Sequence, residues 1–159
     1  MTDLSQITAI LAKAKKGELD DPRLSERFSR LPMLKGLPSQ TKWASTVRMR
    51  LLDSLFPFMA ALEQSNDQLS CAAVMACRLL FSVDNPDFWM NSQEELGTDA
   101  WLAEEIEALL ARDNPHWIEL EPWSAFGFWK QHNPRVARSA RAKLREGQNQ
   151  LNAASAEQA

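Results

Sequence analysis

Three arginines near the C-terminal end of the sequence are the residues best suited to bind a ligand. Arg138, Arg141 and Arg145 are separated by three and four positions, and this spacing predicts one ridge along an α-helix. Arg135 and Lys143 flank the other side of the same predicted helix. A guanidinium group binds phosphate through paired hydrogen bonds, and several together attract nucleic acid in a salt-dependent way. We therefore predict that these five residues contact the phosphate backbone of DNA or RNA.

A second basic group surrounds Trp43 and extends the predicted site. Lys35, Lys42 and Arg50 lie close to this residue in the sequence, and an aromatic ring among cations can stack on a base. We assign Lys42 and Arg50 to the nucleic-acid site. Trp43 itself falls on the apolar half of its predicted helix, so we expect it in the core. Arg48 falls on that half too, and we expect it to pair with an acid or to line a groove, because an unpaired buried charge is costly.

The charges are sorted along the chain, which leaves a second interpretation open. Residues 1–60 carry ten Lys or Arg and six Asp or Glu, residues 61–121 carry two and thirteen, and residues 122–159 carry six and two. This sorting predicts a polarised surface if the basic ends meet in space. Alternatively, the acidic middle segment docks on the arginine ridge and neutralises it.

Aromatic residues of the loop region predict a different class of function. Trp117, Trp123 and Trp129 lie in a connector and are candidate anchors for a protein partner, because aromatic side chains dominate many interfaces. In this alternative the chain is a protein-interaction module or an oligomer subunit that uses its Trp-rich loop and acidic helix. A third alternative, an acidic nucleic-acid mimic, needs acids spaced along one exposed surface.

Residues typical of catalysis or metal binding lack the partners that those functions need. His116 and His132 have no neighbouring Ser or Cys motif, and neither the histidines nor Cys71 and Cys77 have metal-ligand spacing. The cysteines are six positions apart in an apolar run, which places them on different faces of one helix and predicts free thiols. We expect no enzyme activity, no metal and no cofactor.

The acidic pairs and the glycines support the same conclusion. Glu94-Glu95 and Glu104-Glu105 are adjacent in the sequence, so their side chains point to different sides of a helix and are expected to be solvated. The five glycines are scattered singly and form no phosphate-binding loop.

Helices are predicted to position all these residues. Hydrophobic periodicity and caps predict an all-α, compact bundle of about six or seven helices with an aromatic-rich connector. Residues 1–151 form a single domain and residues 152–159 a frayed tail. The predicted helices cover residues 3–16, about 22–31, 39–62 with a kink or break at Pro57, 67–81 at the centre of the bundle, a short segment around 88–90, 98–111, and the segment from Asn133-Pro134 onward.

Two segments are predicted to connect the helices. Residues 31–38 contain two prolines and a glycine and form a turn or extended connector. Residues 113–132 contain a possible short strand, but one strand makes no sheet, so we expect a connector that lays aromatic side chains on the bundle. On the last helix, the apolar stripe that faces the bundle is predicted to contain Val136, Ala140, Leu144 and Leu151.

One segment resembles a family of small uncharacterised bacterial, phage and plasmid proteins. Leu31-Pro32-Met33-Leu34-Lys35-Gly36 is similar to their Leu-Pro-x-Leu-x-Gly turn, and Gln40, Trp43-Ala44 and Val47-Arg48 are similar to the helix that follows it. Phe88-Trp89-Met90-Asn91 resembles their later aromatic pair. The resemblance implies a bacterial or mobile-element setting, and it supplies no catalytic residue.

Composition also bears on localisation. No apolar run reaches the roughly 20 residues that span a bilayer, and the N-terminal residues lack the order of a signal peptide. We therefore expect a cytoplasmic protein without a membrane partner. The leading hypothesis is a non-enzymatic accessory protein of a bacterial or mobile-element assembly that handles nucleic acid.

Overall fold

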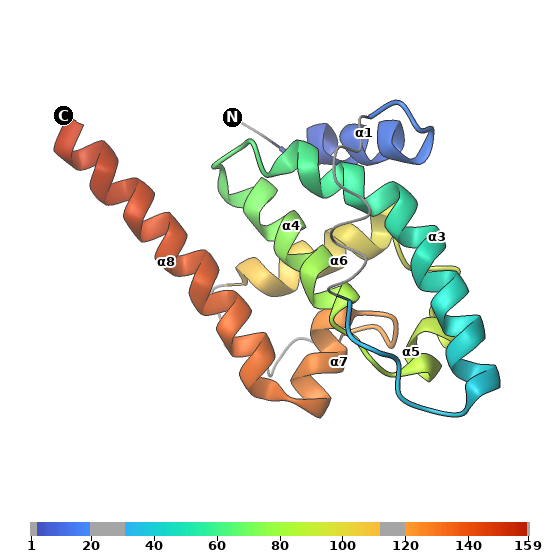
Figure 1. Cartoon of the computed structure of the whole chain (residues 1–159). Coiled ribbons are helices and arrows are strands. Elements are labelled where there is room, and N and C mark those ends of the chain that lie inside the picture. Colours follow the sequence, from blue (N-terminus) through green and yellow to red (C-terminus); the bar gives the residue numbers. More distant parts are fainter. Residues whose placement is uncertain (1–2, 20–30, 112–119, 159) are drawn as a thin grey trace.

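The structure is a computed structural model that describes residues 3–19, 31–111 and 120–158, with side chains as far as residue 147. Within these ranges the chain is all-α, as predicted, and forms seven helices and no strand (Figure 1). The helices are α1 (Leu4–Lys15), α3 (Pro38–Leu62), α4 (Gln68–Phe81), α5 (Pro86–Asn91), α6 (Asp99–Leu110), α7 (Ala125–His132) and α8 (Pro134–Gln158). The short helix predicted near residues 22–31 falls largely outside the described residues.

Helix α4 lies at the centre of the bundle, as its sequence predicts. It contacts α1, α3, α6, α7 and α8. Ala72, Ala73, Ala76 and Leu80 are completely buried, and the small alanine side chains let neighbouring helices approach closely. Helices α7 and α8 form a hairpin on one side of α4, whereas α5 packs against α3 on the other (Figure 1).

Side-chain caps define where most of the helices begin. Such a cap accepts a hydrogen bond from one of the first N–H groups, which have no partner inside the helix. At α1, Asp3 and Gln6 form a capping box. The caps of the four later helices are Asp67 for α4, Asn85 for α5, Thr98 for α6 and Ser124 for α7.

Three features of the fold bear on the sequence-based expectations. Helix α3 runs through Pro57, which is buried inside it, so of the two expected alternatives the break does not occur. Residues 125–132 form helix α7 instead of continuing the connector. Helix α8 continues to Gln158, past Leu151, and it extends beyond the rest of the bundle (Figure 1), while the frayed tail of residues 152–159 stays a prediction.

Candidate functional site

Helix α8 divides the predicted arginine cluster into buried and exposed parts. The side facing the bundle contains Ala137, Ala140, Arg141 and Leu144. Of the predicted apolar stripe, Ala140 and Leu144 are buried and Val136 is partly buried against the core, and Ala137 and Arg141 are buried beside them. Leu151 lies beyond the described side chains.

Arg141 is a structural residue and does not belong to an exposed ridge. The residue is 8% exposed, and Nη2 donates a hydrogen bond to the backbone oxygen of Ala111, directly after α6. The bond satisfies a carbonyl at a helix end, where no helical N–H is available. Burial lowers the pKa of Arg141, and the nearby charge of Arg145 adds to the effect. Arg141 lines the same shallow depression as Arg138 and Arg145, and its contact with nucleic acid stays a prediction.

The remaining cations of α8 point to solvent along two edges. Arg138 and Arg145 are exposed on the edge nearest Arg141, where they line a shallow depression of about 240 Å³. Arg135 and Lys143 are exposed on the opposite edge. Among the described residues, none of these four cations forms an ion pair.

The second edge borders a groove between α4 and α8. The groove has a volume of about 410 Å³, and Arg78 joins Arg135 and Lys143 at its rim. Arg78 also pairs with Glu63, with 3.5 Å between Nη2 and Oε1. The groove is lined in addition by Met75, Leu79, Ser82, Val136, Ser139 and Ala140.

Several acidic residues of the middle segment form ion pairs or hydrogen bonds elsewhere in the described part of the chain. Asp84 pairs with Lys35 at 3.2 Å, and Glu63 pairs with Arg78. Glu104 accepts a hydrogen bond from the backbone N–H of Glu121 at 3.2 Å. No described acid of residues 61–121 forms an ion pair with α8, so these acids do not neutralise its exposed cations.

Glu105 forms a buried cluster that the sequence analysis missed. Its side chain is completely buried, and one carboxyl oxygen accepts a hydrogen bond from Ser124 Oγ. The other accepts the backbone N–H groups of Ala125 at 2.9 Å and Phe126 at 3.2 Å, at the start of α7. Burial raises the pKa of Glu105 to about 8, against the opposing effect of these hydrogen bonds.

The expectation that Glu105 is solvated is therefore wrong. A signal was present in the sequence, because Glu105 lies within the same helix face as Leu102, Ile106 and Leu109. Its cluster is saturated by the backbone and a hydroxyl, and it contacts no cavity described above. The arrangement is structural and holds α7 against α6.

The predicted Trp anchors are largely built into the bundle. Trp129 is half-buried, and its indole Nε1 donates to the backbone oxygen of Leu79 at 2.9 Å. Trp123 is half-buried against the core. Trp117 lies outside the described residues. The two described residues therefore contribute to packing and leave only part of their surface to a partner.

The outer face of α3 is basic and aromatic. Lys42 and Arg50 are exposed there, as predicted. Trp43 is 55% exposed, so the expectation that it belongs to the core is wrong. Arg48 points inward and donates to the backbone oxygen of Pro32 at 2.6 Å. Arg48 therefore forms a hydrogen bond with a backbone carbonyl, whereas we expected from the sequence that it would pair with an acid or line a groove.

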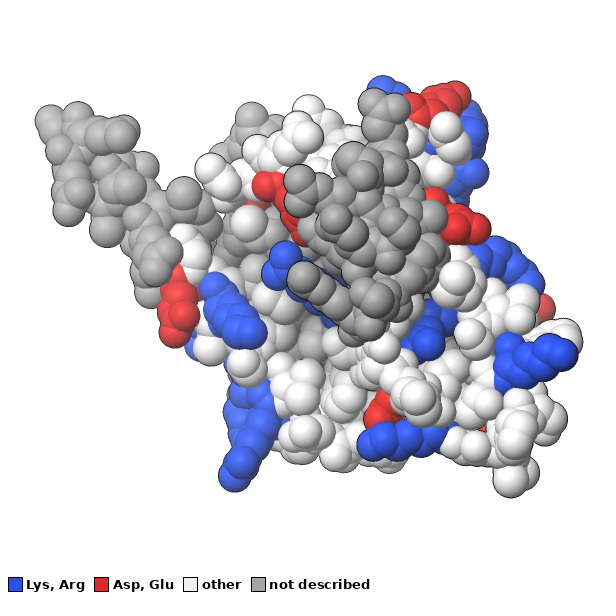
Figure 2. Space-filling view, viewed as in Figure 1, with Lys and Arg blue, Asp and Glu red and all other residues white. Residues whose placement is uncertain are grey.

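Figure 2 shows how the exposed charges are distributed on one face of the molecule. Lys and Arg side chains gather over α8 on the left and over α3 on the right. The two basic groups are thus both visible from this side. Both predicted basic elements are available on this face.

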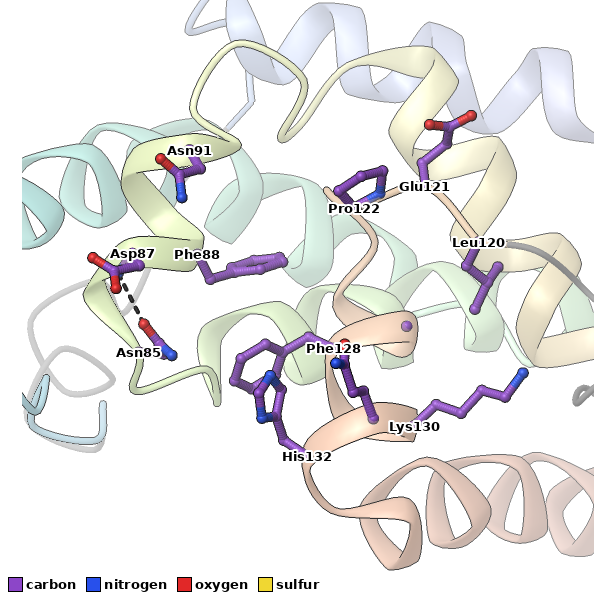
Figure 3. A pocket seen from close by; sticks show the side chains of 12 residues that line it. Asn85, Asp87, Phe88, Asn91, Leu120, Glu121, Pro122, Phe128, Lys130 and His132 are labelled. Atoms are coloured by element: carbon purple, nitrogen blue, oxygen red, sulfur yellow. Dashed lines mark hydrogen bonds between the residues drawn. The ribbon is translucent and has the colours of Figure 1, made fainter.

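A pocket of about 450 Å³ lies between α5, α7 and the segment that precedes α7 (Figure 3). Phe88 from α5 and Phe128 from α7 extend toward each other, with 5.3 Å between ring centroids. His132 lies against Phe128 at 4.3 Å. Polar side chains surround this aromatic wall, including Asn85, Asn91 and Gln131.

The described residues contain no cluster of His, Cys, Asp and Glu that could hold a metal ion. The described helices include none that is both long and apolar enough to cross a membrane. Cys77 is buried, Cys71 is half-buried, and both thiols are free. Burial raises the pKa of each thiol.

Comparisons with known proteins add no identification. No protein-family model matches the chain, and no similar curated protein or solved structure is found. The resemblance of residues 31–48 to small bacterial and mobile-element proteins therefore stays a prediction.

Proposed function

We propose that the chain is a non-enzymatic, cytoplasmic accessory protein that binds the phosphate backbone of nucleic acid through the solvent face of α8. Arg135, Arg138, Lys143 and Arg145 are the contact residues, and the assembly it serves is bacterial or belongs to a mobile element. The observation that carries the proposal is the exposure of these four cations without ion pairs among the described residues.

The charge balance of the whole chain does not oppose this function. The formal net charge is −3, but binding depends on the local field that the nucleic acid meets. The described ion pairs of the acidic segment involve Arg78 and Lys35 and none of the cations of α8. The exposed Lys42 and Arg50 on α3 supply a second contact.

A salt series measures this function directly. We compare the affinity of the protein for single- and double-stranded DNA with that of the double variant Arg138→Ala and Arg145→Ala. Each lost phosphate contact reduces the slope of log affinity against log salt by about one. Arg141 is left intact, because its removal would disturb the end of α6.

A matched control separates a specific surface from general attraction. The variant Lys13→Ala and Lys15→Ala removes the same charge from exposed positions at the end of α1. We expect this control to keep the salt slope of the parent protein. Equal losses in both variants, or no binding near physiological salt, would contradict the assignment to α8.

One observation favours a second candidate, a protein-interaction module or oligomer subunit. Met33, Leu37 and Trp43 are 86%, 64% and 55% exposed, which is unusual for large apolar side chains close together in the sequence. Light scattering across a concentration series tests self-association. In this alternative the variant Leu37→Ser and Trp43→Ala stays monomeric where the parent protein associates.

A further inference from the structure

We propose that the pocket between α5 and α7 binds an unstacked nucleobase of a single strand whose phosphates lie on α8. This inference rests on the proposed function and names the part of the ligand that the pocket receives. Three properties of the pocket support it: an aromatic wall, a rim of amides, and a position beside the start of α8.

The partly exposed Phe128 and the exposed His132 provide a surface for a planar ring, and the buried Phe88 supports Phe128. Phe88, Phe128 and His132 form a continuous row, with neighbouring centroids 5.3 and 4.3 Å apart. Phe88 is held from behind by an edge contact with the buried Trp89. The exposed His132 brings the row to the surface of the molecule. Stacking on aromatic side chains is the usual way in which proteins hold unpaired bases.

The rim of the pocket provides hydrogen bonds that suit the edge of a base. Asn85, Asn91 and Gln131 line it, and each amide group offers both a donor and an acceptor. The oxygen of Asn85 accepts the backbone N–H of Asp87 at 2.9 Å, which fixes the orientation of that amide (Figure 3). The volume of about 450 Å³ falls within the range of small-molecule pockets.

The charges around the pocket favour a neutral ring over a phosphate. Two carboxylates, those of Asp87 and Glu121, lie among the lining residues beside Lys130. They repel an anion, so a phosphate attached to the base has to lie outside the pocket. His132 is followed by α8, which begins at Pro134 and exposes Arg135 and Arg138 within its first turns. A strand on α8 therefore reaches the pocket by turning one base inward.

The test separates binding of the base from binding of the phosphates. We measure the affinity for a single-stranded DNA of about twelve nucleotides, a length within the range of known single-strand sites. A strand of equal length with tetrahydrofuran units in place of the nucleosides has the same phosphates and no bases. We expect this base-free strand to bind about tenfold more weakly, as the loss of a stacked base predicts.

Variants at the rim assign the difference to the pocket. The variant Asn91→Ala and Gln131→Ala removes two exposed amides, so the fold is expected to persist. It should bind the natural strand more weakly and the base-free strand normally. The control Gln64→Ala and Gln93→Ala removes two exposed amides outside the pocket lining and should leave the preference intact.

The alternative outcomes have distinct meanings. Equal affinity for both strands would overturn the inference and leave phosphate binding by α8 in place. Failure of both strands to bind would overturn the inference and the proposed function together. In a third outcome, a free nucleoside monophosphate binds at the rim residues, and the protein shows no preference for the natural strand over the base-free strand. This would show that the base comes from a free nucleotide, and it would overturn the assignment to a strand.

Discussion

The start of α7 and the outer face of α8 use charged residues in opposite ways. At α7, the buried Glu105 is surrounded by a hydroxyl and two backbone N–H groups, so all its hydrogen-bonding capacity serves the fold. On α8, Arg138 and Arg145 extend into solvent without an ion pair among the described residues. The difference shows that an ionisable side chain is available to a ligand where it does not already form hydrogen bonds within the fold.

The largest effect is expected from Glu105→Ala. The substitution leaves two N–H groups and the Ser124 hydroxyl without their acceptor and opens a cavity, so the free energy of unfolding should fall by about 3 kcal/mol or more. Urea unfolding measures this loss. Glu107→Ala, at an exposed position of α6, should change it by less than about 0.5 kcal/mol. Similar values for the two variants would show that the cluster does not stabilise α7.

The pH dependence of stability sharpens the same contrast. Burial raises the pKa of Glu105 from 4.5 to about 8, so between these values the unfolded chain loses a proton that the folded chain retains. Stability should therefore decrease as pH rises from about 4.5 to 8, by up to about 1.4 kcal/mol per pH unit. Thermal unfolding at several pH values measures the slope, and Glu105→Gln should flatten it. An unchanged slope in that variant would assign the effect to other groups.

A third prediction compares two neighbouring arginines of α8. Arg141→Ala removes the donor to the Ala111 oxygen, so the free energy of unfolding should fall by about 1–3 kcal/mol. Arg145→Ala should change stability by less than about 0.5 kcal/mol and should weaken binding to DNA. Measurements of unfolding and of DNA affinity on both variants test the division. Loss of binding without loss of stability in Arg141→Ala would reverse our assignment.

The smallest effect is expected from Gly147→Ala. Gly147 lies inside α8, and a Cβ atom added there meets no heavy atom within 4 Å. Alanine is favoured over glycine in a helix by up to about 1 kcal/mol. Circular dichroism should show a small gain in helix content with unchanged DNA affinity. A loss of helix content would show that Gly147 forms a close contact in solution that leaves no room for a methyl group.

The sequence predicted the helices well because hydrophobic periodicity and caps are local signals. The segments 98–111 and 67–81 illustrate this, since helix α6 and the central position of α4 are confirmed. Trp43 was assigned to the wrong side of α3, because the periodicity of one helix does not show which of its faces the neighbouring helices cover. The burial of Arg141 was missed for a related reason. Its partner, the Ala111 oxygen, is thirty positions away in the sequence, and only packing brings the two together.

The pocket between α5 and α7 was not predictable for the same physical reason. Its aromatic wall joins Phe88 and Phe128, which belong to helices far apart in the sequence. Taken separately in the sequence, Phe88 and Phe128 are each typical of a core side chain. The contact arises because α7 is a helix here, and that helix begins where Glu105 and Ser124 cap its N–H groups.

The exposure of Trp43 also has an optical consequence. The sequence has six Trp and no Tyr, so indole dominates the ultraviolet emission of the protein. Trp89 and Trp101 are completely buried, whereas Trp43 is 55% exposed on α3. An aqueous quencher such as iodide should therefore reach Trp43 well before the buried pair. Trp43 contributes a quenchable, red-shifted component from the α3 surface, and Trp89 and Trp101 contribute a blue-shifted component that reports on the integrity of the core.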